Sequence, residues 1–120
     1  MLLKRANEKT WSECVLANEG DRVSGSEMNL PLAVTPETLY NQQVIPVSSG
    51  DRLLVYTDGL TEATSKAGEL FGIERLSNVL DANADLTLSK LKSAVLQELQ
   101  RHTGKGLTHD DVTLIAMEIH

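Results

Sequence analysis

Three aspartates in this sequence are placed where they could build a cation site. Asp58 directly follows the apolar run at residues 52–57, and Asp110 and Asp111 directly precede the apolar run at residues 112–119. If the two runs are neighbouring antiparallel strands, the end of one lies beside the start of the other, and the three carboxylates meet at one rim of a sheet. Clustered carboxylates repel one another, so a hard cation is expected among them.

The same aspartates also have an ordinary structural interpretation. Asp58 and Gly59 form a common turn dipeptide, and an aspartate in front of a strand commonly marks where the strand begins. On spacing alone this interpretation is favoured, because the pairing of the two strands is itself inferred. Gly59 would in either case leave room for the backbone to approach a ligand closely.

Longer motifs surround these aspartates and shift the preference from ordinary turn residues toward a cation site. They run from Gly50 to Ala63, from Gly68 to Gly72, from Glu74 to Leu76 and from Asp110 to Leu114, and they follow a Leu-Pro-Leu-Ala-Val segment at residues 30–34. In this order, over roughly residues 29–118, they resemble the metal-dependent protein phosphatases of type 2C. Within that family the resemblance is to the bacterial serine phosphatases of the stage II sporulation E and sigma-regulation type. Asn29 and Ala33 stand where those relatives usually have glycine.

The resemblance implies a centre of two Mg²⁺ or Mn²⁺ ions at which an activated water attacks a phosphoserine or phosphothreonine in line. The positions that bind metal in the family correspond to Asp58 and Asp110, with Gly59 at the metal rim. Asp111 and Thr113 are expected to support the ligands by hydrogen bonding. The implied substrate is a bacterial signalling phosphoprotein such as an anti-sigma-factor antagonist, and full-length relatives carry an N-terminal regulatory domain.

One motif of the family is missing from this chain. The sequence contains no Gly-Asp-x-x-Gly-His-Gly, which in relatives supplies the aspartate that bridges both metals. Residues 1–120 are therefore interpreted as the C-terminal portion of such a phosphatase domain, inactive when alone, with metal affinity toward the millimolar range. The alternative is a non-catalytic, degenerate phosphatase fold that serves as an adaptor or dimerisation module. The missing motif favours this alternative, and the retained Asp58 and Asp110 oppose it.

The elements that must position these residues follow from the apolar pattern. Strands are expected within residues 10–18, 43–47, 52–57 and 112–119, and the nearly continuous apolar run at 52–57 predicts a strand covered on both faces. The turn residues at 48–51 make the strands that they join antiparallel. These features predict an α+β fold with a mainly antiparallel sheet and two packed helices, which the resemblance places within an α-β-β-α phosphatase sandwich.

Two helices are expected between the third and fourth strands. The first begins near Gly72, and the second begins after a cap at Thr87 or Asp85 and ends at Gly104. The last turn of the second contains His102, whose place is explained by the helix dipole. The expected core-facing residues are Ile73, Leu76, Val79 and Leu80 in the first helix and Leu88, Leu91, Val95 and Leu99 in the second.

Composition excludes several classes of protein. The chain has 120 residues, a net charge of −6 and few aromatic residues, which argues against nucleic-acid binding. No apolar run approaches the ~20 residues of a membrane span, and the start is too polar for a signal peptide, so a cytoplasmic protein is expected. Cys14 is the single cysteine and is interpreted as an apolar filler. Unpaired strand edges and surplus apolar surface predict self-association.

Overall fold

The computed structural model describes residues 1–14, 44–104 and 112–120. Two compact units divide the chain, one formed by residues 1–14 and 47–120 and the other by residues 15–46. The first unit contains every helix and strand that the structure describes. Its fold is therefore the scaffold that positions Asp58 and Thr113.

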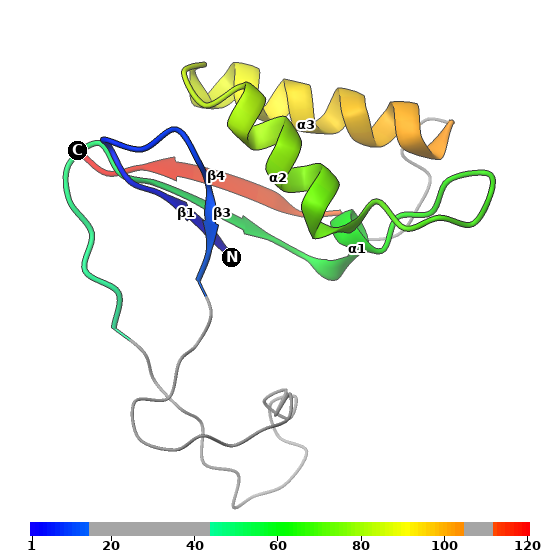
Figure 1. The fold of residues 1–120 in the computed structure, drawn as a ribbon, viewed down its shortest axis with the longest axis horizontal. Helices are drawn as coiled ribbons and strands as arrows, with labels where there is room; N and C mark the ends of the chain where they lie inside the picture. The colour runs from blue at the N-terminus through cyan, green and yellow to red at the C-terminus, as the bar shows by residue number, and fades with distance from the viewer. Residues whose placement is uncertain (15–43, 105–111) are drawn as a thin grey trace, which may run out of the picture. The chain divides into compact units, whose positions relative to one another are not determined.

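A four-stranded antiparallel sheet forms the base of this unit (Figure 1). The strands lie in the order β2-β1-β3-β4, so segments from both ends of the chain flank the central strand β3. Leu54 of β3 lies opposite Leu2 of β1 on one side and Ala116 of β4 on the other. The four strands are β1 (Leu2–Lys4), β2 (Ser12–Glu13), β3 (Arg52–Tyr56) and β4 (Leu114–Glu118).

Three helices follow β3 in the chain, α1 (Asp58–Thr61), α2 (Gly72–Ala82) and α3 (Leu88–Thr103). Figure 1 shows α2 and α3 lying together on the same side of the sheet. The core lies between these helices and the sheet, because apolar side chains of both are almost fully buried there. Its main members are Leu2, Trp11, Leu54, Leu60, Phe71, Leu76, Leu80, Leu91, Val95 and Leu99. No helix among the described residues is long and apolar enough to cross a membrane.

The predicted α+β class with an antiparallel sheet and two packed helices is confirmed. The predicted helix ends are close to those observed, since Thr87 is the N-cap of α3 and Gly104 ends that helix in the left-handed conformation at φ 70°. Leu91, Val95 and Leu99 form its buried stripe, and Leu88 is half-buried. Ile73 is the exception in α2, because 37% of this residue is exposed.

Two predicted strands differ from the structure. In the segment at residues 10–18 only Ser12–Glu13 is a strand among the described residues. Just before this strand, the backbone N–H of Trp11 donates to the Asp81 carboxylate of α2, 2.8 Å away. Residues 44–47 form no strand, and Pro46 has no N–H to donate to a ladder. The short strand β1 and the single turn of α1 were not predicted, because three and four residues are too few to show a period.

The prediction that β3 is covered on both faces is wrong for the described residues. Val55 is 36% exposed, and its neighbours on β4, Ile115 and Met117, are 50% and 40% exposed. These three residues alternate with the ones that face the helices, so they define the opposite face of the sheet, here called the uncovered face. Near-continuous apolar composition did not distinguish a strand buried on both faces from one with an apolar exposed face.

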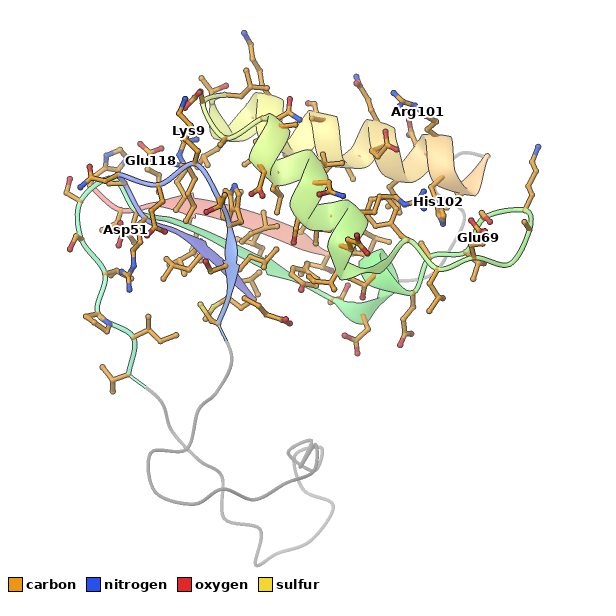
Figure 2. All side chains as sticks on the ribbon, viewed as in Figure 1. Lys9, Asp51, Glu69, Arg101, His102 and Glu118 are labelled. Carbon is orange, nitrogen blue, oxygen red and sulfur yellow. The ribbon has the colours of Figure 1, made fainter. Side chains whose placement is uncertain are left out.

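The turn before β3 is fixed by the buried carboxylate of Asp51. One of its oxygens accepts from the backbone N–H of Ala6 at 2.9 Å, and the other accepts from the Ser48 N–H at 3.0 Å and from Arg5 Nη1 at 2.8 Å. Gly50 adopts φ 87°, and a Cβ there would lie 3.0 Å from the Ala6 Cβ. A side chain at Gly50 would therefore be strained by both its backbone angle and its neighbour. Figure 2 shows Asp51 and Glu118 at the same end of the sheet.

Asp51 should make the stability of the protein sensitive to acid. The hydrogen bonds from Ser48 and Ala6, followed by that from Arg5, hold the pKa of Asp51 below its ordinary value of 3.8. A carboxyl with a depressed pKa stabilises the fold fully above its unfolded pKa, and this stabilisation is lost as the pH falls through the folded pKa. Asp51→Asn is expected to destabilise the protein at pH 7 and to flatten the fall in unfolding free energy below about pH 4.

Urea denaturation of wild type and of Asp51→Asn at pH 7 and at about pH 3 measures this effect. Asp85→Asn is the matched control, because the Asp85 side chain is 82% exposed. Its ion pair with the equally exposed Lys9 amine is long, at 3.9 Å, and should contribute little to stability. An equal loss of stability on acidification in wild type and Asp51→Asn would contradict the assignment.

Candidate metal site

The pairing of β3 with β4 is the geometric condition for the predicted site, and the structure meets it. The two strands are antiparallel neighbours, with Tyr56 opposite Leu114. Beyond this pair, the Thr57 N–H donates to the Thr113 carbonyl at 3.1 Å, and the Thr113 N–H donates to Thr57 Oγ1 at 3.0 Å. The carboxyl end of β3 and the entry to β4 therefore lie side by side. Asp58 follows the first of these ends directly.

Asp58 is the first residue of α1, and its backbone is tied into that helix. Its carbonyl accepts from the Glu62 N–H at 2.8 Å and from Thr61 Oγ1 at 3.2 Å. Leu60 anchors the helix, since its side chain is fully buried and its N–H donates to the Thr57 carbonyl at 3.0 Å. The Asp58 side chain remains exposed. A fixed backbone thus presents a carboxylate at the end of the sheet.

Negative charge gathers near this end of the sheet. Burial raises the pKa of the Tyr56 phenol, and the carboxylates of Glu13 and Asp58 raise it further. The two acids come from β2 and from α1, which are far apart in the sequence.

The remaining predicted site residues are placed as follows. Gly59 lies in α1 next to Asp58, and Thr113 lies at the entry to β4, where its backbone is bonded to Thr57. Asp110 and Asp111 lie outside the described residues. In residues 1–14, 44–104 and 112–120, no three acidic, histidine or cysteine side chains gather to hold a metal. Asp58 fits a hard cation as one oxygen ligand, and the predicted proximity of Asp58 to Asp110 stays a prediction.

The comparisons with known proteins decide the family. The model of the stage II sporulation protein E (SpoIIE) family matches residues 11–120. The chain belongs to the SpoIIE family. A relative, Protein IcfG of Synechocystis sp., is 29% identical over 103 residues, which cover 86% of this chain and 16% of IcfG.

Among solved structures, the SiaA-PP2C domain of Pseudomonas aeruginosa matches with a TM-score of 0.54 and 26% identity over 63% of this chain and 31% of that domain. This SpoIIE chain is thus a PP2C-like phosphatase region, as its motifs predicted. It spans about a sixth of the length of IcfG and about a third of the SiaA domain.

His102, whose position the sequence analysis attributed to the helix dipole, has specific hydrogen-bond partners. His102 lies in the last turn of α3, with Nε2 2.8 Å from the Glu69 carbonyl and Nδ1 2.9 Å from Arg75 Nη1. Arginine only donates, so Nδ1 accepts and Nε2–H donates to the carbonyl. The ring also meets Phe71 edge-on at 5.5 Å, and Figure 2 shows His102 and Glu69 beside each other.

The Gly68–Gly72 motif of this SpoIIE chain is therefore held against α3. Its backbone forms a hairpin, since Thr64 bridges Leu70 and the Phe71 N–H donates to the Ala63 carbonyl at 2.8 Å. Asp51 and His102 were both missed as structural residues, because most of their partners are distant in sequence. The available signal was that Asp51 lies in the Gly50–Ala63 motif and that the partners of His102, Glu69 and Arg75, lie in the next two motifs.

Proposed function

We propose that this chain is part of a metal-dependent phosphatase that hydrolyses phosphoserine or phosphothreonine in a protein. Asp58 and Asp110 are the proposed ligands of Mg²⁺ or Mn²⁺, with Gly59 at the rim and Asp111 and Thr113 as supports. The observation that carries the proposal is the pair of hydrogen bonds between Thr57 and Thr113, because it puts the end of β3 beside the entry to β4. Membership of the SpoIIE family and likeness to a PP2C domain support it.

The roles of the residues follow from their positions. Such a metal, when bound, lowers the pKa of coordinated water and offsets the charge of the phosphoryl oxygens. The carboxylate of Asp58 offers it a hard oxygen donor on a backbone fixed by α1 and Leu60. Thr57 and Thr113 keep the two strand ends in register, so they are proposed to set the separation between Asp58 and the residues that precede β4.

The proposed substrate is a phosphoprotein of bacterial signalling, of the kind represented by anti-sigma-factor antagonists, in the cytoplasm. This part of the proposal rests on the resemblance of the motifs. On the same ground, the complete protein is proposed to carry an N-terminal regulatory domain. The complete site is proposed to hold two metal ions, and the Gly-Asp-x-x-Gly-His-Gly motif that it needs is absent from residues 1–120.

A second candidate function is a non-catalytic adaptor built on the same fold. The absence of that motif from residues 1–120 favours it. Retention of Asp58 at the exposed end of β3 opposes it, because an adaptor has no physical reason to keep neighbouring carboxylates that repel one another when no cation is bound. Metal binding separates the two candidates.

Calorimetric titration with Mn²⁺ and with Mg²⁺ tests the proposed ligands. Wild type is expected to bind in the millimolar range, because two carboxylates are a small part of the 6 or so oxygen ligands that such ions take. Asp58→Asn should weaken the affinity at least about tenfold, since an amide supplies an uncharged oxygen in place of a carboxylate. Asp85→Asn, at an exposed aspartate of the α2–α3 connection, should leave the affinity unchanged.

Two results would change the interpretation. Equal binding by wild type and Asp58→Asn would remove Asp58 from the site and favour the adaptor. Micromolar binding that Asp58→Asn abolishes would show that the chain holds a more complete site than two aspartates provide.

A further inference from the structure

His102 joins three parts of the fold through a ring that has to be neutral. Its Nε2–H donates to the Glu69 carbonyl at 2.8 Å, and its Nδ1 accepts from Arg75 Nη1 at 2.9 Å. Glu69 lies in the hairpin before α2, Arg75 near the start of α2, and His102 in the last turn of α3. A protonated imidazole donates through both nitrogens and accepts through neither. The bond from Arg75 and a proton on Nδ1 therefore exclude each other.

The described charges around His102 leave Arg75 without an ion pair. Within residues 1–14, 44–104 and 112–120, no carboxylate forms an ion pair with His102 or with Arg75. Glu98, one turn before His102, is held by Arg101 at 2.9 Å. The elements that pack against His102 carry Lys66 and Glu69 on the hairpin, Glu74 and Arg75 on α2, and Glu98 and Arg101 on α3. Lys66 adds a cation at the end of α3, since a Cβ on Gly104 would lie 2.8 Å from Lys66 Cε.

The dipole of α3 acts against this exclusion, because a helix C-terminus favours a positive charge. The dipole is equivalent to about half an elementary charge at that end of the helix. Arg75 brings a full positive charge to 2.9 Å from Nδ1. Coulomb energy grows with charge and falls with distance, so the direct contact outweighs the dipole. A proton on Nδ1 therefore drives Arg75 away from the ring.

We propose that His102 is a proton switch that holds Arg75 when neutral and releases it when protonated. The bond to the Glu69 carbonyl survives, since Nε2 donates in both states, so His102 loses only its link to α2. Arg75 lines a cavity of about 730 Å³ together with Glu74 and Glu98, which gives the released guanidinium carboxylates to turn toward. The contact is present when the ring is neutral and is lost as the pH falls through the range of about pH 8 to 5 in which histidine gains its charge.

The pH dependence of unfolding tests the switch. Urea denaturation at about pH 7.5 and about pH 5.5, on either side of histidine titration, gives the equilibrium constant of unfolding for wild type, His102→Gln and Arg75→Met. Glutamine takes no proton in this range, and methionine has no donor. Between the two pH values the wild-type constant should rise about tenfold more than that of either variant, because a bond from a charged donor is lost only where both residues are present.

His120→Gln is the matched control, since His120 is exposed at the last described position. It should keep the wild-type pH dependence. Nitrogen-15 NMR of the His102 ring gives a second readout, because at about pH 7.5 Nδ1 should carry no proton. The Arg75 guanidinium signals should then change as Nδ1 is protonated in wild type and stay unchanged in His102→Gln.

The proposal is overturned if His102→Gln or Arg75→Met keeps the wild-type pH dependence. It is also overturned if Nδ1 carries the proton at about pH 7.5, since Arg75 could not then donate to it. Circular dichroism checks that each variant folds. Because Arg75 is exposed, Arg75→Met decides the question even if His102→Gln fails to fold.

Discussion

Leu54→Ala is expected to lower the free energy of unfolding by about 2–5 kcal/mol. Leu54 is fully buried at the centre of the sheet, between Leu2 of β1 and Ala116 of β4. It belongs to the same core cluster as Leu91 and Val95 of α3. Truncation removes apolar contacts and leaves a cavity that the strands on both sides prevent from collapsing.

The next residue supplies a matched control for this substitution. Val55 lies on the same strand but on the uncovered face, with 36% of the residue exposed. Val55→Ala should cost less than about 1 kcal/mol, because little buried surface is lost. Urea denaturation followed by the fluorescence of the single tryptophan, Trp11, which is 6% exposed, measures both losses. Comparable losses at Leu54 and Val55 would mean that the uncovered face is buried in solution, as a stacked second copy would bury it.

The sequence predicted the elements whose signals are local and long. The apolar run at residues 52–57 became β3, and the stripe at Leu91, Val95 and Leu99 became the buried side of α3. The segment at residues 44–47 failed, because β-forming composition is outweighed there by a proline that cannot donate to a ladder. Burial of β3 on both faces could not be predicted either, since apolar composition does not say how many layers cover a sheet.

The candidate site was predicted to the extent that it depends on strand order. Asp58 lies at the end of β3 and Thr113 at the entry to β4, as antiparallel pairing of the two apolar runs requires. The hydrogen bond from the Thr113 N–H could not be predicted, because its acceptor is the side chain of Thr57 in place of a backbone carbonyl. The fixing of Asp51 by Ala6 likewise joins positions that share no local pattern.

Arg52 gives the second large effect, because one side chain joins the sheet to the connection between the helices. Its Nε donates to Glu118 Oε2 at 2.7 Å across the β3–β4 pair. Its Nη1 donates to the Ala84 carbonyl at 3.0 Å and to the Leu86 carbonyl at 2.7 Å, both between α2 and α3. The Arg52 side chain is only 16% exposed and that of Glu118 is 29% exposed, so water replaces these bonds poorly.

Arg52→Met keeps the apolar stem of the side chain and removes every donor. It is expected to cost about 2–4 kcal/mol, because the two carbonyls lose a charged donor and a partly buried Glu118 carboxylate is left without its cation. The stability of Arg52→Lys should lie between that of Arg52→Met and that of wild type. A single ammonium retains the charge but cannot reach both Glu118 and the carbonyls as the planar guanidinium does.

A double-mutant cycle with Glu118→Gln separates the two functions of Arg52. If the bonds to Ala84 and Leu86 dominate, Arg52→Met should remain costly in the Glu118→Gln background, and the coupling energy should be about 1 kcal/mol. If the ion pair dominates, most of the cost should disappear in that background. Chemical denaturation of the four proteins gives the cycle. A loss below about 0.5 kcal/mol for Arg52→Met in both backgrounds would show that the connection between α2 and α3 is held to the sheet by core packing, with Arg52 adding little.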